Sequence, residues 1–115
     1  MKKFALFAFN GESMCFVHVL LNGLDMRGRG HDVKVVIEGA ATKLLPELFQ
    51  EGGMLSPLFR RALEEGLLEG VCKACSAKMG TLGTAEEHGL RLLADMSGHP
   101  SIARYLELGY EALVF

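Results

Sequence analysis

Two kinds of hydrophobic pattern alternate along this chain. Residues 4–9 form a continuous apolar run and residues 33–37 are rich in valine and isoleucine, which is typical of strands covered on both faces of a parallel sheet. Residues 67–72, 90–94 and 111–115 predict three further strands. The pattern therefore predicts five strands in all.

Between the predicted strands, apolar residues recur at the spacing of one helical face. Pro46 must begin, kink or split one of these helices because it offers no backbone donor. Thr84 and Glu87 have the capping-box spacing and predict a single turn before the fourth strand, while Pro100 suits a first helical position. The clearest helical stripe lies before Gly28 and consists of Met14, Val17, Leu20, Leu21 and Leu24.

Five strands separated by helices in 115 residues predict a single α/β domain, residues 1–115, with one hydrophobic core. The expected fold is a flavodoxin-like three-layer sandwich with a mostly parallel five-stranded sheet in the order 2-1-3-4-5. In such sheets, ligands bind beyond the carboxyl ends of the strands where the strand order reverses. We therefore expect the loop of Asn10, Gly11 and Glu12 to lie beside Cys72 and Cys75.

Composition and charge narrow the class of protein. Half of the residues are hydrophobic and 23% are charged, so a homo-oligomer is expected, with Met54, Leu55, Leu58 and Phe59 as its exposed apolar surface. The net charge is −2 and the chain has no run of Lys or Arg long enough to bind phosphates, which argues against a nucleic-acid partner. No segment approaches the ~20 apolar residues of a membrane span, and the apolar start stops too early for a secretory signal. A cytoplasmic protein is expected.

The most informative chemical motif is Cys72-Lys73-Ala74-Cys75, at the predicted junction of the third strand and a helical turn. Backbone N–H groups that open a helical turn, together with Lys73, favour a thiolate, so we predict a pKa for Cys72 below the free value of about 8.5. His99 follows the fourth strand at the same sheet edge and could assist proton transfer, or could be a surface residue at a helix entry. The third cysteine, Cys15, is interpreted as packing.

Two alternatives to thiol chemistry are less favoured by the sequence. A structural zinc site needs four ligands, and a single CxxC would have to recruit Cys15 or one of the four histidines without a second pair at ligand spacing. Flavin binding would need a Ser/Thr- or Gly-rich phosphate loop after the first strand, where the chain has a short loop that contains Glu12. Neither a metal nor an organic cofactor is therefore expected.

At residues 71–80, Val-Cys-Lys-Ala-Cys-Ser-Ala-Lys-Met-Gly, the chain resembles the DsrE/DsrF-like sulfur-relay family, especially its small single-domain members. The shared features of this segment are a strand that ends in cysteine, a second cysteine three residues on, and Gly80 eight residues after the first. The similarity extends to the opening apolar strand with its Gly-containing turn, a late helix led by Ser101, and a last strand that ends in Phe115.

The resemblance implies a cytoplasmic α/β fold, trimers or hexamers, and a persulfide on the cysteine that matches Cys72. Our first hypothesis is therefore a sulfur-transfer protein with sulfur donor and acceptor proteins as partners, in which Cys75 resolves or tunes the persulfide. Many relatives have arginine where this chain has Met79, a difference that changes the local charge. The competing hypothesis is a non-catalytic assembly or regulatory subunit in which the cysteines only pack.

Overall fold

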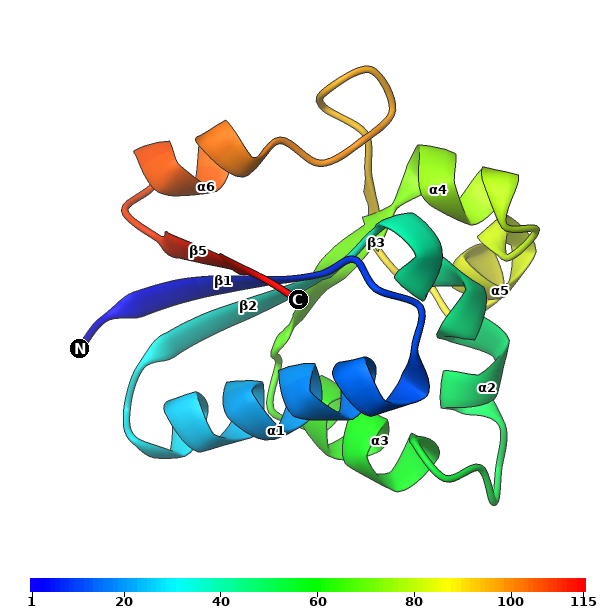
Figure 1. The fold of residues 1–115 in the computed structure, drawn as a ribbon, viewed down its shortest axis with the longest axis horizontal. Coiled ribbons are helices and arrows are strands. Elements are labelled where there is room, and N and C mark those ends of the chain that lie inside the picture. Colours follow the sequence, from blue (N-terminus) through cyan, green and yellow to red (C-terminus); the bar gives the residue numbers. More distant parts are fainter.

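The computed structural model describes all 115 residues and contains a five-stranded sheet with helices on both faces (Figure 1). The strands are β1 (Lys3–Ala8), β2 (Asp32–Ile37), β3 (Leu68–Cys72), β4 (Leu92–Leu93) and β5 (Glu111–Val114). The helices are α1 (Ser13–Gly28), the 3-10 helix η1 (Gly39–Leu44), α2 (Leu45–Phe49), α3 (Ser56–Glu64), α4 (Lys73–Lys78), α5 (Leu82–Glu87) and α6 (Ile102–Glu107).

The sheet is entirely parallel, which confirms the predicted flavodoxin-like fold class. Its strand order is β4-β3-β2-β1-β5, so the expected order 2-1-3-4-5 is wrong. The first four strands follow one another across the sheet, and the connection through α6 then returns the chain to the far side of β1. The strand order therefore reverses between β1 and β5 instead of between β1 and β3.

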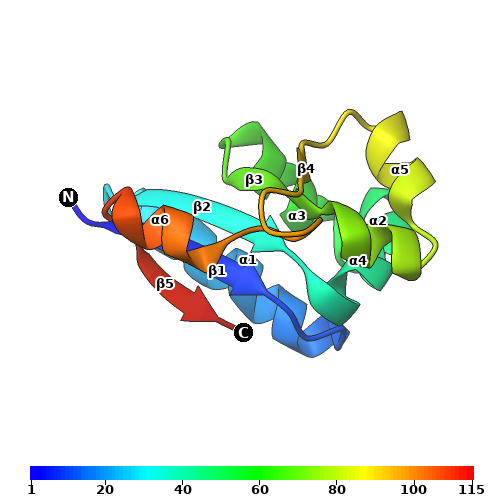
Figure 2. The same ribbon diagram turned by 90° about the horizontal axis from the view of Figure 1, so that it is seen from above.

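The two faces of the sheet are covered unequally (Figures 1 and 2). Helices α1 and α3 cover one face, where Phe16, Val19 and Phe59 pack on the inward residues of the strands in the larger core. Helix α6 covers the other face with a smaller core of Ala5, Phe7, Val36, Leu93, Tyr105 and Tyr110. Strands buried on both faces explain why the strand segments read as nearly continuous apolar runs.

Several local predictions need correction. The capping box is wrong, because Thr84 lies inside α5, whose N-cap is Thr81. Pro100 precedes the next helix, where Ser101 is the N-cap and its hydroxyl accepts a hydrogen bond from the Arg104 N–H at 3.4 Å. The fourth strand is shorter than expected because only Leu92–Leu93 pairs with β3.

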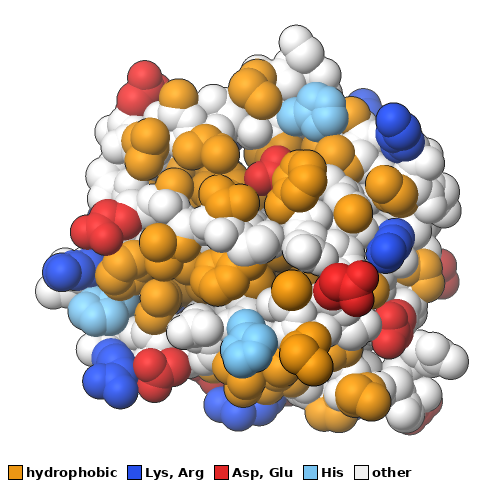
Figure 3. All heavy atoms as spheres, viewed as in Figure 1, with side chains coloured by type: hydrophobic (Ala, Val, Ile, Leu, Met, Phe, Trp, Pro, Cys, Tyr) orange, Lys and Arg blue, Asp and Glu red, His pale blue; other side chains and the backbone are white.

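The exposed apolar surface differs from the predicted one. Leu55 and Phe59 are buried in the larger core and Leu58 packs against it, so Met54 alone of that group is largely exposed. Figure 3 shows hydrophobic side chains gathered on the face that the edge strand β5 borders. Exposed apolar residues on β5, around α6 and at the end of β1 are Phe9, Ile102, Leu106, Leu108, Leu113 and Val114. None of the helices is long and apolar enough to cross a membrane.

A polar network links α6 and β5 to the sheet. The Tyr105 hydroxyl donates to Oε2 of Glu69 at 2.9 Å, and the Tyr110 hydroxyl donates to Oδ2 of Asp32 at 2.7 Å. The Lys34 ammonium lies 3.2 Å from Oε1 of Glu69. Burial and the neighbouring carboxylates raise the pKa of both phenols, that of Tyr110 to about 12.

The chain contains two tyrosines, so their ionisation can be followed by tyrosinate absorbance. We expect neither phenol of the folded protein to ionise near the ordinary value of 10.0, and the Tyr110 transition to fall near pH 12. Because the folded pKa values exceed the unfolded ones, the two phenols stabilise the fold fully below pH 10, and this stability is lost as the pH rises through the folded pKa values. Tyr110→Phe should remove the transition near pH 12, and two transitions near pH 10 in the folded wild type would contradict the network.

Candidate functional site

The two cysteines of the CxxC segment flank the first turn of a helix. Cys72 ends β3 and is the N-cap of α4, and its Sγ accepts a hydrogen bond from the Cys75 N–H at 3.3 Å. A helix leaves its first N–H groups without backbone partners, so a sulfur at the N-cap satisfies one of them. Cys72 is fully buried, with 0% of its surface exposed, whereas Cys75 is half-buried.

A turn in residues 94–99, which follows β4 in the chain, brings His99 to the cysteines. The Ala74 N–H, in the first turn of α4, donates to the Gly98 carbonyl at 2.9 Å, which ties the turn to the helix. Met96 and His99 pair through two backbone hydrogen bonds of 2.7 and 2.9 Å. The turn requires positive φ angles of 51° at Ser97 and 91° at Gly98, and glycine adopts such a conformation without strain.

The imidazole of His99 faces both thiols. Its Nδ1 lies 3.1 Å from Sγ of Cys72 and 3.5 Å from Sγ of Cys75. The ligand atoms of the three residues all lie within 4.8 Å of one another. We call Cys72, Cys75 and His99 the thiol–imidazole cluster; it can exchange a proton between sulfur and nitrogen, move a group between the two sulfurs, or bind a soft cation.

Glu38 lies next to the thiol–imidazole cluster because of the strand register. Ile37 of β2 pairs with Val71 of β3, so Glu38 follows beside Cys72 at the carboxyl edge of the sheet. Burial raises the pKa of the Glu38 carboxyl, and the charge of His99 acts in the opposite direction. A carboxyl group therefore stands beside the imidazole and the two thiols of the cluster at one edge of the sheet.

The prediction of a lowered pKa for Cys72 is wrong. Burial, and to a smaller extent hydrogen bonding with the Cys75 side chain, raise the pKa of this thiol to about 12, although the hydrogen bond from the Cys75 backbone N–H acts in the opposite direction. Lys73, which was expected to stabilise the thiolate, is exposed to solvent and does not contribute to the pKa of Cys72. Cys72 is thus a protonated thiol at neutral pH.

The loop of Asn10, Gly11 and Glu12 does not lie beside the cysteines, because β2 separates β1 from β3 in the sheet. Asn10 and Gly11 instead line a pocket of about 450 Å³ with Val114 and Phe115, at the carboxyl ends of β1 and β5. This is the point where the strand order reverses. Glu12 is the exposed N-cap of α1, and the third cysteine, Cys15, is partly buried on α1.

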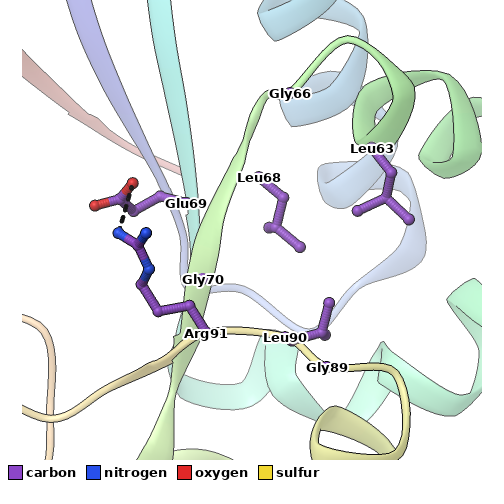
Figure 4. Close-up of a pocket in the computed structure, with 8 residues that line it drawn as sticks. All are labelled: Leu63, Gly66, Leu68, Glu69, Gly70, Gly89, Leu90 and Arg91. Atoms are coloured by element: carbon purple, nitrogen blue, oxygen red, sulfur yellow. Dashed lines mark ion pairs between the residues drawn. The ribbon is translucent and has the colours of Figure 1, made fainter.

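A second pocket, of about 320 Å³, opens at the amino end of β3 (Figure 4). Its residues include Gly66, Leu68 and Leu90, together with Arg91 and Glu69, whose charged groups lie 3.7 Å apart. The pocket contains neither a thiol nor an imidazole, and its charges already pair with each other. The thiol–imidazole cluster lies at the opposite, carboxyl end of the strand.

Sequence reasoning identified each member of the thiol–imidazole cluster but not their common contact. His99 lies 27 residues from Cys72 and 24 from Cys75, and this spacing matches no ligand or catalytic motif. The expected position of His99 at the carboxyl edge is confirmed. Its approach to both thiols depends on the turn at Ser97 and Gly98, which the hydrophobic pattern does not indicate.

The fold and the cluster define a small α/β protein with two thiols and an imidazole at the carboxyl edge of a parallel sheet. The chain belongs to the same family as the uncharacterized protein MJ0733 of Methanocaldococcus jannaschii, to which it is 30% identical over 111 residues, 96% of this chain and 88% of that protein. An uncharacterized protein of Archaeoglobus fulgidus is 37% identical over 59 residues, 51% of this chain and 95% of that protein. Another from the same organism is 57% identical over 37 residues, 32% of this chain and 100% of that protein. No family model and no solved structure matches the sequence.

Burial predicts the order in which the three cysteines react with iodoacetamide. In reduced, metal-free protein at neutral pH we expect Cys15 and Cys75 to be labelled first and Cys72 last, because its thiol is both buried and protonated. Peptide mass spectrometry of samples taken over time measures the order. Full labelling in denaturant provides the control, and labelling of native Cys72 as fast as Cys15 would contradict the structure.

Proposed function

We propose that this protein is a sulfur carrier of the DsrE-like type, which holds sulfane sulfur as a persulfide on the CxxC segment at the end of β3. The main support is the thiol–imidazole cluster, in which one ring nitrogen lies 3.1 and 3.5 Å from two sulfurs. The resemblance of residues 71–80 to the sulfur-relay family supports the same function. The cytoplasm and protein partners that donate and accept sulfur belong to this proposal.

Burial divides the work between the two cysteines. The resemblance implies that Cys72 carries the sulfur, yet a donor protein cannot reach a side chain that is fully buried. Cys75 is half-buried on the first turn of α4 and is the accessible thiol of the pair. Sulfur therefore enters at Cys75 and is stored on Cys72, where burial protects it from unrelated thiols.

The transfer is an exchange without net oxidation. The Cys75 sulfur attacks the outer sulfur of a donor persulfide, the donor S–S bond breaks, and the donor leaves as a thiol with the proton that Cys75 loses. The Cys72 sulfur then attacks the same outer sulfur as its proton passes to Nδ1 of His99. Cys75 leaves as a thiolate and takes that proton back, so the imidazole returns to its neutral form.

Sulfur uptake by single-cysteine variants tests this division. Incubation of the reduced, metal-free protein with a sulfane-sulfur donor should add the mass of one sulfur atom to the chain. Cys75→Ser should remove the adduct because a hydroxyl of ordinary pKa is a far weaker nucleophile. Cys72→Ser should still accept sulfur but lose it faster to added dithiothreitol.

Cys15→Ser is the matched control, because it removes a thiol that lies on α1 instead of at the cluster. It should take up and keep sulfur as the wild type does. A stable adduct on Cys75→Ser would reverse the order of the two cysteines. A wild-type chain that takes up no sulfur would end the carrier proposal.

The alternative is a non-catalytic assembly or regulatory subunit with packing cysteines. The complete burial of Cys72 is the observation that favours it, since free cysteine is among the residues most often buried. In that case none of the three cysteines forms a persulfide. Cys72→Ser then lowers the free energy of unfolding, and the wild type and the variant alike take up no sulfur.

We further propose a homo-oligomer, a trimer or a hexamer, formed through the apolar surface around β5. β5 is an edge strand with Leu113 and Val114 exposed, so its free backbone groups and side chains suit pairing with another copy. Light scattering at micromolar concentration should give a mass above one chain, and Val114→Lys should reduce it. A monomeric wild type would contradict this surface as an interface.

A further inference from the structure

We propose that Cys72, Cys75 and His99 form a zinc site with three protein ligands and one open position. The sequence argued against zinc because the CxxC pair lacked a partner at ligand spacing, but the turn at residues 94–99 supplies one from elsewhere in the chain. The proposal is independent of sulfur transfer, because it needs only the three side chains and the cation.

The distances fit a tetrahedral site. Bonds of about 2.3 Å to sulfur and about 2.0 Å to nitrogen separate neighbouring S and N ligand atoms by about 3.5 Å in a tetrahedron. The Nδ1 of His99 lies 3.1 Å from Sγ of Cys72 and 3.5 Å from Sγ of Cys75. All three ligand atoms lie within 4.8 Å of one another, so rotamer adjustments can bring them around one ion.

The surrounding backbone supports thiolate ligands. The Cys75 N–H already donates to Sγ of Cys72 at 3.3 Å, and this hydrogen bond strengthens when the sulfur is charged. The Gly98 carbonyl, tied to the Ala74 N–H at 2.9 Å, holds the histidine at its distance from the helix. The three ligands are two thiols and an imidazole. This donor set selects zinc over magnesium or calcium, which prefer oxygen ligands such as carboxylates.

The open position distinguishes this site from a structural zinc site. Structural sites have four protein ligands, whereas three protein ligands leave a place for water or another small ligand. Glu38 follows β2 beside Cys72, so one carboxyl group stands next to the proposed site without being one of its ligands. On binding, each thiol releases its proton to the buffer and no oxidation takes place.

Metal titration of the full chain tests the site. The chain is first reduced and freed of metal with a chelator, and Zn²⁺ is then added in competition with a chromophoric chelator. We expect one zinc per chain, and we expect Co²⁺ at the same site to give the intense charge-transfer absorption of cobalt thiolates. Cys75→Ser and His99→Ala should each weaken zinc binding by more than the about 10- to 100-fold that loss of an outer-sphere partner causes.

Matched controls remove the same residue types from outside the cluster. Cys15→Ser and His18→Ala, both on α1, should bind zinc as the wild type does. The wild type alone provides a second measurement, because zinc should protect Cys75 from iodoacetamide and leave Cys15 reactive. Failure to bind zinc, binding that His99→Ala does not weaken, or a Cys75 that zinc leaves reactive would each overturn the proposed site, whatever the result of the sulfur-uptake experiment.

Discussion

The candidate site depends on one backbone hydrogen bond, from the Ala74 N–H to the Gly98 carbonyl at 2.9 Å. The first N–H groups of α4 have no partners within the helix and must find them elsewhere. Cys72 Sγ satisfies the N–H of Cys75, and Gly98 satisfies that of Ala74. Because His99 follows Gly98 directly, the requirement to cap a short helix also places an imidazole against two thiols.

This arrangement determines what chemistry the site can perform. A thiol in a hydrophobic environment keeps its proton, since burial disfavours the charged form, and the pKa of Cys72 is accordingly raised. Any reaction of this sulfur must therefore remove the proton as the new bond forms. His99 can accept the proton during sulfur transfer, and a zinc ion can displace it on binding. Both proposals therefore use the same cluster to offset the cost of forming a thiolate in a buried position.

The secondary structure could be predicted from the sequence because buried parallel strands and amphipathic helices have distinct periodicities, as residues 4–9 and the stripe from Met14 to Leu24 illustrate. The strand order could not, because hydrophobic patterns describe what each element buries and not which neighbour it pairs with. The CxxC motif could be identified because its two cysteines are close in the sequence. The position of Glu38 beside Cys72 could not, because it depends on the pairing of β2 with β3. The contact of His99 with both thiols depends on a turn with positive φ angles at Ser97 and Gly98, which leaves no hydrophobic signal.

The ring ¹⁵N resonances of His99 report directly on whether this imidazole and the two cysteines form one cluster. In reduced, metal-free protein, Nδ1 faces two thiols that can donate hydrogen bonds, so we expect a tautomer with an unprotonated Nδ1 and a proton on Nε2. Its Nδ1 resonance should shift in Cys75→Ala, while the resonances of the exposed His18 remain unchanged. A His99 ring whose resonances match those of His18 and do not respond to Cys75→Ala would contradict the cluster.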